Sequence, residues 1–180
     1  MTVERAILLG VLGVLVAQRI TELVWARRNE HWLRANGARE FGARHYPAMV
    51  LLHAGFLASL AFEGWQCGPR IHSHWRVLAV LLGAALAFRY WCLAALGKYW
   101  NTKIFVVPGA RLLRSGPYHW FKHPNYGVVI AELLLYPLLF QAWWTLLWAS
   151  ALNAVMLAIR ISTENQALAL LSEDPRAHRN

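Results

Sequence analysis

The sequence predicts an all-α integral membrane protein whose five transmembrane helices form a single domain over residues 1–180. Apolar residues make up 58% of the chain and its mean hydropathy is positive, as in proteins that cross a membrane several times. These residues gather into five blocks of spanning length, and most basic residues lie between the blocks. The net charge of +9 therefore fits a positive-inside pattern, and we expect membrane lipids rather than nucleic acid as partners.

The first predicted span covers about residues 6–26 and carries charges inside an apolar block. Arg19 and Glu22 are three residues apart, so their side chains can share one helix face. Charges within a span normally face the bundle interior. We therefore expect an ion pair that fixes helix packing, followed by a polar, basic connection over residues 27–46.

The second and third predicted spans cover about residues 47–65 and 76–96. His53 lies inside the second span, where a lone histidine is more often a hydrogen-bonded packing residue than a catalytic one. Cys67 and Cys92 should lie at different membrane depths, so we expect no disulfide between them. Neither cysteine has a metal-ligand partner at useful spacing, and no metal site is predicted.

The fourth and fifth predicted spans cover about residues 124–140 and 143–161 and should form a hairpin. Pro137 lies near the end of the fourth block, where a proline kinks or ends a helix. The connection at residues 141–142 is so short that the two helices must run antiparallel beside each other. The start of the fourth helix and the end of the fifth are thus expected on the same side.

Lysine and arginine are unevenly divided between the two sides that five spans would create. The connection 27–46, the loop 98–123 and the segment from Arg160 onward hold thirteen, against three on the other side. The positive-inside rule then places the N-terminus outside and the loop and C-terminus in the cytoplasm. We expect this topology in a bacterial inner membrane.

The stretch 98–126 is the longest segment outside the apolar blocks, and it is dense in aromatic and basic residues. Residues 116–118 indicate a tight turn of Gly, Pro and Tyr. His123 and Pro124 then open an apolar helix, and Pro124 suits the first helical position. Free N–H groups at that helix end favour an anionic ligand group. A basic loop that only sets topology is the alternative interpretation.

Arg160 and Glu164 are four residues apart near the end of the fifth block, so both can project from one helix face. The predicted hairpin places them beside His123 and Pro124. A cation, a carboxylate, an imidazole and loop aromatics would then meet in one cytoplasmic cofactor pocket. An interfacial ion pair with a snorkelling arginine is the structural alternative.

These residues resemble the isoprenylcysteine carboxyl methyltransferase family of membrane enzymes that use S-adenosyl-L-methionine. The resemblance spans roughly residues 96–164 and rests on Gly116-Pro117-Tyr118, on Lys122-His123-Pro124-Asn125-Tyr126, and on Arg160 with Glu164. A closer similarity is to a bacterial branch that includes O-methyltransferases of long-chain alkylpyrones. It rests on Arg27-Arg28-Asn29-Glu30, His45-Tyr46-Pro47, the stretch from Leu96 to Lys103, and the turn from Leu139 to Ala142.

The resemblance implies a set of site residues. The cofactor-binding residues would be Lys103, Ala110, Arg111, Leu112, Leu113, Tyr118, His123, Pro124, Asn125, Tyr126 and Glu164. Arg160 would face the acceptor and act in catalysis, with His123 as a possible proton acceptor, and Trp100 and Asn101 would contact the substrate. Many family members have a second acidic residue where this chain has Asn165, so a role for a second carboxylate does not carry over.

The function that the resemblance implies is methyl transfer to a lipophilic small molecule that reaches the pocket from the bilayer. The best match is O-methylation of a long-chain alkylpyrone or similar polyketide, with a type III polyketide synthase as pathway neighbour. Carboxyl methylation of prenylcysteine-like acids and N-methylation of phospholipid amines are alternatives, although Arg160 disfavours an amine acceptor. A non-catalytic membrane scaffold, which would bind no cofactor, is the alternative from a different class.

Overall fold

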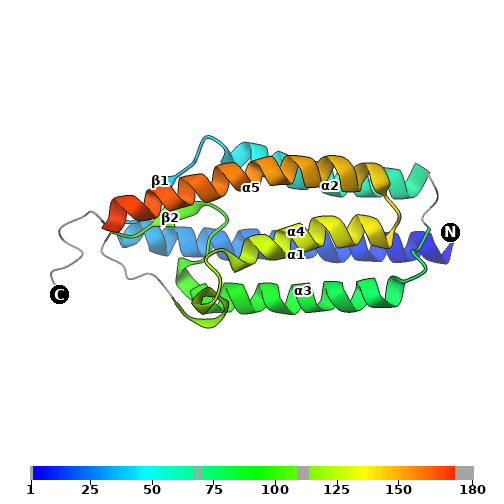
Figure 1. Cartoon of the computed structure of the whole chain (residues 1–180), viewed down its shortest axis with the longest axis horizontal. Helices are drawn as coiled ribbons and strands as arrows, with labels where there is room; N and C mark the ends of the chain where they lie inside the picture. Colours follow the sequence, from blue (N-terminus) through cyan, green and yellow to red (C-terminus); the bar gives the residue numbers. More distant parts are fainter. Residues whose placement is uncertain (1, 67, 69, 109–113, 173–180) are drawn as a thin grey trace.

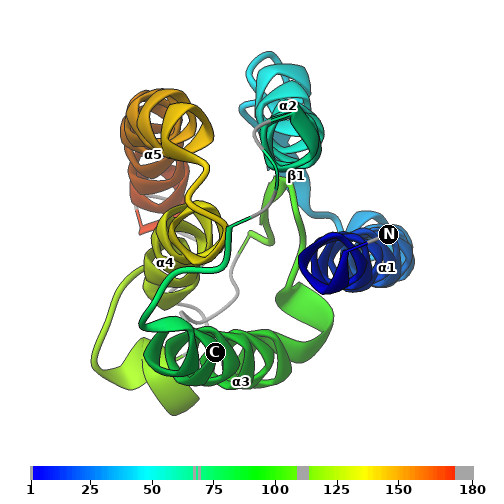
Figure 2. The same cartoon turned by 90° about the vertical axis from the view of Figure 1, so that its right-hand side faces the viewer.

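The computed structural model describes residues 2–66, 68, 70–108 and 114–172, which form a bundle of five helices along one axis (Figure 1). Seen end-on, α4 lies between α5 and α3, while α1 and α2 complete the bundle (Figure 2). Two short strands and two 3₁₀ helices, η1 and η2, lie in the connections. The elements in chain order are α1 (Val3–Ala35), β1 (Arg39–Phe41), α2 (Tyr46–Gln66), α3 (Trp75–Leu96), η1 (Gly97–Tyr99), β2 (Ile104–Val106), η2 (Gly116–His119), α4 (Pro124–Leu139) and α5 (Trp143–Ser172).

The helices have the length and composition of an integral membrane protein. Within the described residues, α1, α2, α3 and α5 are long and apolar enough to cross a membrane. The helix α4 is apolar but has only 16 residues. At 1.5 Å per residue it reaches about 24 Å, against a hydrocarbon core of about 30 Å. The membrane class is therefore confirmed, while a fifth full span remains a prediction.

The first helix is longer than the sequence pattern predicted. The prediction of a polar connection from residue 27 is wrong up to Ala35, because α1 continues that far. The extension buries Asn29 and Leu33 on the same face as Ala26 and leaves the basic side chains of residues 27 and 28 exposed. Buried residues three and four positions apart make this part of α1 an amphipathic helix. The sequence pattern did not reveal it because most residues of the segment are polar, which obscures the helical spacing of the apolar ones.

The predicted helical class is borne out, and a small two-stranded antiparallel sheet that the sequence did not predict lies in the connections. Arg39 lies opposite Val106, and Phe41 lies opposite Ile104. Strands of three residues are too short to show a readable alternation of apolar and polar residues. The sheet ties the connection after α1 to the loop before α4, at the end of the bundle where α5 finishes (Figure 1).

The hairpin of α4 and α5 is confirmed, because the two helices pack side by side and only three residues separate them. Gln141 adopts a φ of 53°, a left-handed conformation that reverses the chain. The backbone N–H of Ala142 donates to the carbonyl of Pro137 at 2.8 Å and closes the turn. The helix α5 continues to Ser172 rather than ending near residue 161, so Arg160 lies well inside it.

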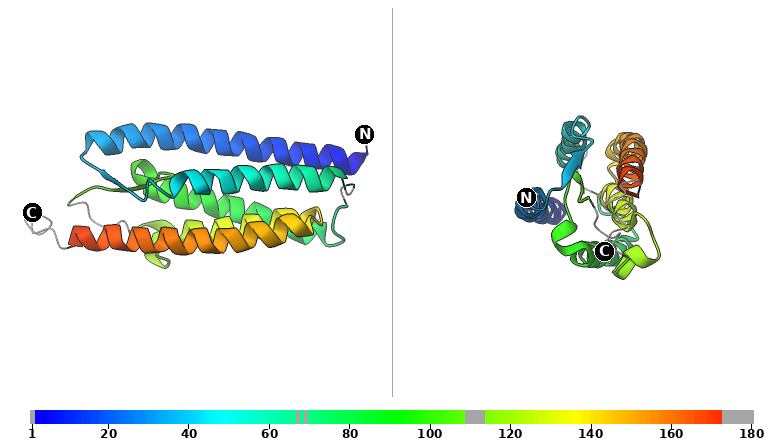
Figure 3. Two further views of the ribbon diagram at one scale, coloured as in Figure 1. Left: turned by 90° about the horizontal axis from the view of Figure 1, so that it is seen from above. Right: turned by 90° about the vertical axis from the view of Figure 1, so that its left-hand side faces the viewer.

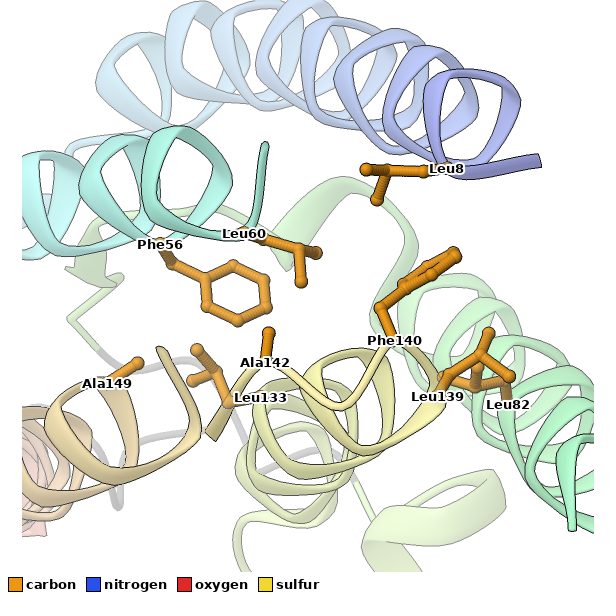
Figure 4. Close-up of a cluster of buried hydrophobic side chains, with 9 residues drawn as sticks. All are labelled: Leu8, Phe56, Leu60, Leu82, Leu133, Leu139, Phe140, Ala142 and Ala149. Carbon is orange, nitrogen blue, oxygen red and sulfur yellow. The ribbon is translucent and has the colours of Figure 1, made fainter. Parts of the chain in front are cut away.

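A cluster of buried apolar side chains holds the bundle together at the end where the chain begins (Figure 4). Leu8 from α1 and Leu60 from α2 lie among side chains from α3, α4 and the hairpin turn. This cluster packs the end of the bundle that lies opposite the sheet. The end with the sheet is therefore shaped mainly by polar residues.

Glu63 of α2 caps the start of α5 from a neighbouring helix. Its Oε2 accepts hydrogen bonds from the backbone N–H and the hydroxyl of Thr145 at 2.9 and 2.7 Å, and its Oε1 accepts from Trp144 N–H at 3.1 Å. A carboxylate at a helix N-terminus satisfies free N–H groups and favours the helix dipole.

We expect Glu63→Ala to lower the free energy of unfolding by about 1–2 kcal/mol, because the N–H groups of α5 lose their acceptor. Glu63→Gln, which keeps an amide oxygen as acceptor, should retain most of that stability. Thermal unfolding in detergent checks both variants. Equal stability of the alanine and unmutated proteins would remove the capping role.

Candidate active site

A cavity of about 500 Å³ opens at the end of the bundle that carries the sheet. It lies between the end of α3, β2, η2, the first turns of α4 and the later turns of α5. Figure 3 shows that the C-terminal ends of α1 and α5 lie near the strands, at this same end of the molecule. The predicted site residues that line the cavity are Trp100, Asn101, Lys103, Tyr118, His123, Asn125, Tyr126, Arg160 and Glu164.

Arg160 is a buried cation at the edge of this cavity, only 8% exposed. Its Nη2 donates to the carbonyl of Thr102 at 2.7 Å, and its Nη1 contacts the sulfur of Met49 at 3.0 Å. Its Nε donates to the hydroxyl of Tyr126 at 3.0 Å. None of the carboxylates in the described part of the chain forms an ion pair with it. A buried charge without a counter-ion favours an anionic ligand.

Glu164 lies one turn further along α5 and collects two donors from α4. Tyr126 donates its hydroxyl to Glu164 Oε2 at 2.5 Å, and His123 Nδ1 lies 3.5 Å from the same oxygen. The His123 and Tyr126 rings stack with centroids 5.3 Å apart. Tyr126 therefore joins Arg160 to Glu164 through one hydroxyl and holds their side chains apart.

Two buried polar atoms of residues that line the cavity have no hydrogen-bond partner among the described residues. They are His123 Nε2 and Asn125 Oδ1, on either side of Pro124 at the start of α4. Burying a polar atom without a partner costs free energy. Because both residues line the cavity, a polar ligand there can satisfy them.

The model of the isoprenylcysteine carboxyl methyltransferase family matches residues 77–170, which is more than half of the chain. The chain belongs to this family. The match includes every described residue around the cavity from Leu96 to Leu168. Membership in the family indicates a membrane methyltransferase.

Two relatives match nearly the whole chain. The "Uncharacterized protein YpbQ" of Bacillus subtilis strain 168 is 46% identical over 157 residues, which are 87% of this chain and 94% of that protein. An "Uncharacterized protein" of Haemophilus influenzae is 28% identical over 158 residues, 87% of this chain and 92% of its own length. No solved structure matches significantly. Both alignments extend well beyond the segment that the family model covers.

Lys103, which the family resemblance assigned to the cofactor, lines the cavity but is held from outside it. Its Nζ lies 3.0 Å from Glu30 of α1 and 3.8 Å from Glu40 of β1. The side chain of Asn101 accepts from the Lys103 backbone N–H at 2.9 Å and donates to the carbonyl of Ala26 at 2.8 Å. The amide of Asn101 thus shapes the loop, and its proposed contact with substrate remains a prediction.

The other predicted site residues differ in how deeply they are buried and in whether they line the cavity. Trp100 is buried and packs against Trp25 with ring centroids 5.4 Å apart. Tyr118 lines the cavity, and burial raises the pKa of its hydroxyl well above the ordinary value, so it stays neutral. Pro124 is buried at the first position of α4, as predicted. Residues 110–113 lie outside the described part of the chain.

Sequence reasoning missed the residues that seat Arg160 from the side of α2. The hydroxyl of Tyr46 lies 3.1 Å from that of Thr102, whose carbonyl accepts from Arg160. Met49, one turn into α2, contacts the same guanidinium. His45 is nearby, and burial together with the charge of Arg160 lowers the pKa of its imidazole. The His45-Tyr46-Pro47 motif was the sequence signal for this region, but the resemblance assigned no function to its residues.

Proposed function

We propose that the protein is an S-adenosylmethionine-dependent O-methyltransferase of a lipophilic acidic acceptor, such as a long-chain alkylpyrone or similar polyketide. The observation that supports this most is the buried guanidinium of Arg160, which faces the cavity without a carboxylate partner. A planar guanidinium favours an oxyanion, which it can bind with two parallel hydrogen bonds. An acidic enol supplies that oxyanion.

The residues around the cavity fit the proposed cofactor. S-adenosylmethionine supplies a methyl group on a positively charged sulfur and carries an amino acid portion with both charges. Glu164 offers a carboxylate for the ammonium group, and the unpartnered Asn125 Oδ1 offers a further acceptor. In the tautomer that carries its proton on Nδ1, toward Glu164, His123 would present the lone pair of Nε2 as another acceptor. These residues hold and orient the ligand.

Methyl transfer to an ionised acceptor depends on positioning and on exclusion of water. An acidic enol is largely ionised at neutral pH, so the reaction requires no dedicated base. In this proposal Arg160 holds the oxyanion, and Tyr126 keeps Arg160 at a fixed distance from Glu164. His123 then serves orientation through the contact of its Nδ1 with Glu164, because an ionised acceptor has no proton to remove.

The alkyl tail of the acceptor would remain in the bilayer. Trp120 and Phe121 line the cavity and are 67% and 60% exposed, although both are large and apolar. Aromatic residues of this kind are typical of the membrane–water interface. They support access from the membrane rather than from solution.

An acceptor panel tests the proposed reaction. Protein in lipid nanodiscs would be incubated with methyl-labelled S-adenosylmethionine and, in turn, a long-chain 4-hydroxy-2-pyrone, a prenylcysteine and phosphatidylethanolamine. We expect label in the pyrone. Label only in the phospholipid amine would overturn the acidic-acceptor assignment, label only in the prenylcysteine would replace the enol by a carboxylate, and no labelling of any acceptor would count against the proposal.

The proposed topology gives a separate prediction. Ser115 is exposed beside the cavity, next to η2, and the excess of lysine and arginine at this end of the bundle supports a cytoplasmic location for it. Ser115→Cys, with Cys67→Ser to remove a competing thiol, should react with a membrane-impermeant maleimide only in inside-out vesicles. Labelling in intact cells would reverse the orientation.

A further inference from the structure

We propose that a charged cluster of Arg19, Glu22, Arg89 and Glu132 is a positioning device for the cavity. It sets the register between α1 and α3, and α1 in turn holds the segment 97–103 that forms one cavity wall. The functional consequence rests on the proposed cofactor binding at this cavity, whereas the register can be tested without it.

The charged cluster joins three helices through short hydrogen bonds. Arg89 of α3 grips Glu22 of α1 with two parallel bonds of 2.5 and 2.8 Å, and it reaches Glu132 of α4 at 3.0 Å. Arg19 donates to Glu22 at 2.9 Å and to Glu132 at 2.5 Å. Arg89, Glu22 and Glu132 are each 4% exposed. The predicted pair of Arg19 and Glu22 is thus half of a larger cluster.

The same register recurs further along α1 and α3, which run parallel from the end where the chain begins (Figure 1). Glu22 pairs with Arg89, 67 residues later, and the side chain of Asn29 donates to the carbonyl of Gly97, 68 residues later. The two contacts lie about two helical turns apart along α1, and Gly97 directly follows the last residue of α3. Sliding α1 by one turn would break both.

Beyond the charged cluster, the extension of α1 contacts the segment 97–103 repeatedly. Asn29 also donates to the carbonyl of Trp100 at 2.7 Å, and the carbonyl of Ala26 accepts from Asn101 at 2.8 Å. Glu30 holds Lys103. Trp100, Asn101 and Lys103 all line the cavity, so the position of α1 fixes where this wall stands.

Energetic considerations favour a role in register rather than bulk stability. Two arginines and two glutamates sum to zero charge, but each must lose its hydration inside the bundle. Apolar residues of similar volume often give equal or greater stability, whereas bidentate ion pairs tolerate only one alignment. The helix pairs with the closest backbone packing are α3 with α4 and α4 with α5, so α1 depends on such long-side-chain contacts for its register with α3.

The test uses a variant that removes the tie between α1 and α3 while keeping the charge balanced. Arg89→Gln alone leaves two carboxylates facing one arginine and is expected to fold poorly, so the working variant is Glu22→Gln with Arg89→Gln. Register is measured by crosslinking between two introduced cysteines, Trp32→Cys and Lys98→Cys. In the unmutated protein the Nζ of Lys98 lies 5.6 Å from the ring centroid of Trp32. Cys67→Ser removes a competing thiol, and Cys92 is fully buried. Glu63→Ala, which loses the cap of α5 far from α1's extension, is the control for reduced stability.

We expect the double variant to crosslink less efficiently and to bind S-adenosylhomocysteine about tenfold more weakly than the unmutated protein. The fraction that does crosslink should recover near-normal affinity, because the covalent link replaces the lost register. Unchanged crosslinking or affinity in the double variant would overturn the proposal. Weak affinity that the crosslink fails to restore would also overturn it, since the charged cluster would then act locally. If the unmutated protein binds no S-adenosylhomocysteine, the proposed function fails, and the crosslinking yields still decide the register.

Discussion

Arg160→Lys should reduce methylation of a long-chain 4-hydroxy-2-pyrone by roughly tenfold or more, about 1.4 kcal/mol in the transition state. Lysine keeps the positive charge but has a single ammonium group. It cannot at once donate to Tyr126, to the carbonyl of Thr102 and to an acceptor oxyanion in the plane that the guanidinium now defines. The initial rate of label transfer at saturating cofactor measures the loss.

The affinity of the Arg160→Lys variant for cofactor is the internal control. We expect it to stay close to that of the unmutated protein, because Glu164 and His123 are unchanged. Collapse of cofactor binding in this variant would move Arg160 to the cofactor side of the cavity. Acceptors of graded chain length complete the test: each methylene that stays in an apolar environment contributes about 0.8 kcal/mol, so equal turnover of short and long pyrones would contradict access from the bilayer.

Glu164→Ala should weaken binding of S-adenosylhomocysteine by roughly 1.5–3 kcal/mol, the range for a hydrogen bond to a charged group. The carboxylate is the only acid in the described residues that lines the cavity. Its loss removes the counter-charge for an ammonium group. It also leaves the hydroxyl of Tyr126 and Nδ1 of His123 without their present acceptor. Titration calorimetry in detergent gives the affinity directly.

Glu164→Gln separates charge from hydrogen bonding at this position. The amide oxygen can still accept from Tyr126, so the packing of α4 against α5 should persist while the negative charge is lost. We expect cofactor affinity to fall in both variants. If glutamine restored full affinity, the contribution of Glu164 would lie in orienting Tyr126, and the proposed pairing with an ammonium group would be wrong.

The parts of this site that sequence could predict are those fixed by short-range geometry. The spacing of Arg160 and Glu164 placed both on one helix face, and the short turn at residues 140–142 forced α4 and α5 together. These two constraints bring His123 to Glu164 without any knowledge of the rest of the bundle. The family motifs pointed to the same residues.

The remaining parts depend on contacts between distant segments, which no local pattern reports. Nothing in the sequence pairs Glu22 with Arg89, or Arg19 with Glu132, because the partners come from three helices. The extension of α1 could not be recognised because its exposed face is basic and looks like a polar connection. Its hydrogen bonds to the segment after α3 come from Asn29, whose partners are distant in sequence. The same holds for Met49 and Thr102, which seat Arg160 from other elements.

Calorimetry of the unmutated protein with S-adenosylhomocysteine tests the central claim most directly, because the account requires the cavity beside Arg160 and Glu164 to be a cofactor site. Purified protein in detergent or nanodiscs would be titrated with the product, and with adenosine alone as the control for the amino acid portion. We predict saturable binding of one S-adenosylhomocysteine per chain and markedly weaker binding of adenosine. No saturable heat at any concentration of S-adenosylhomocysteine, with no thermal stabilisation of the protein, would contradict the account.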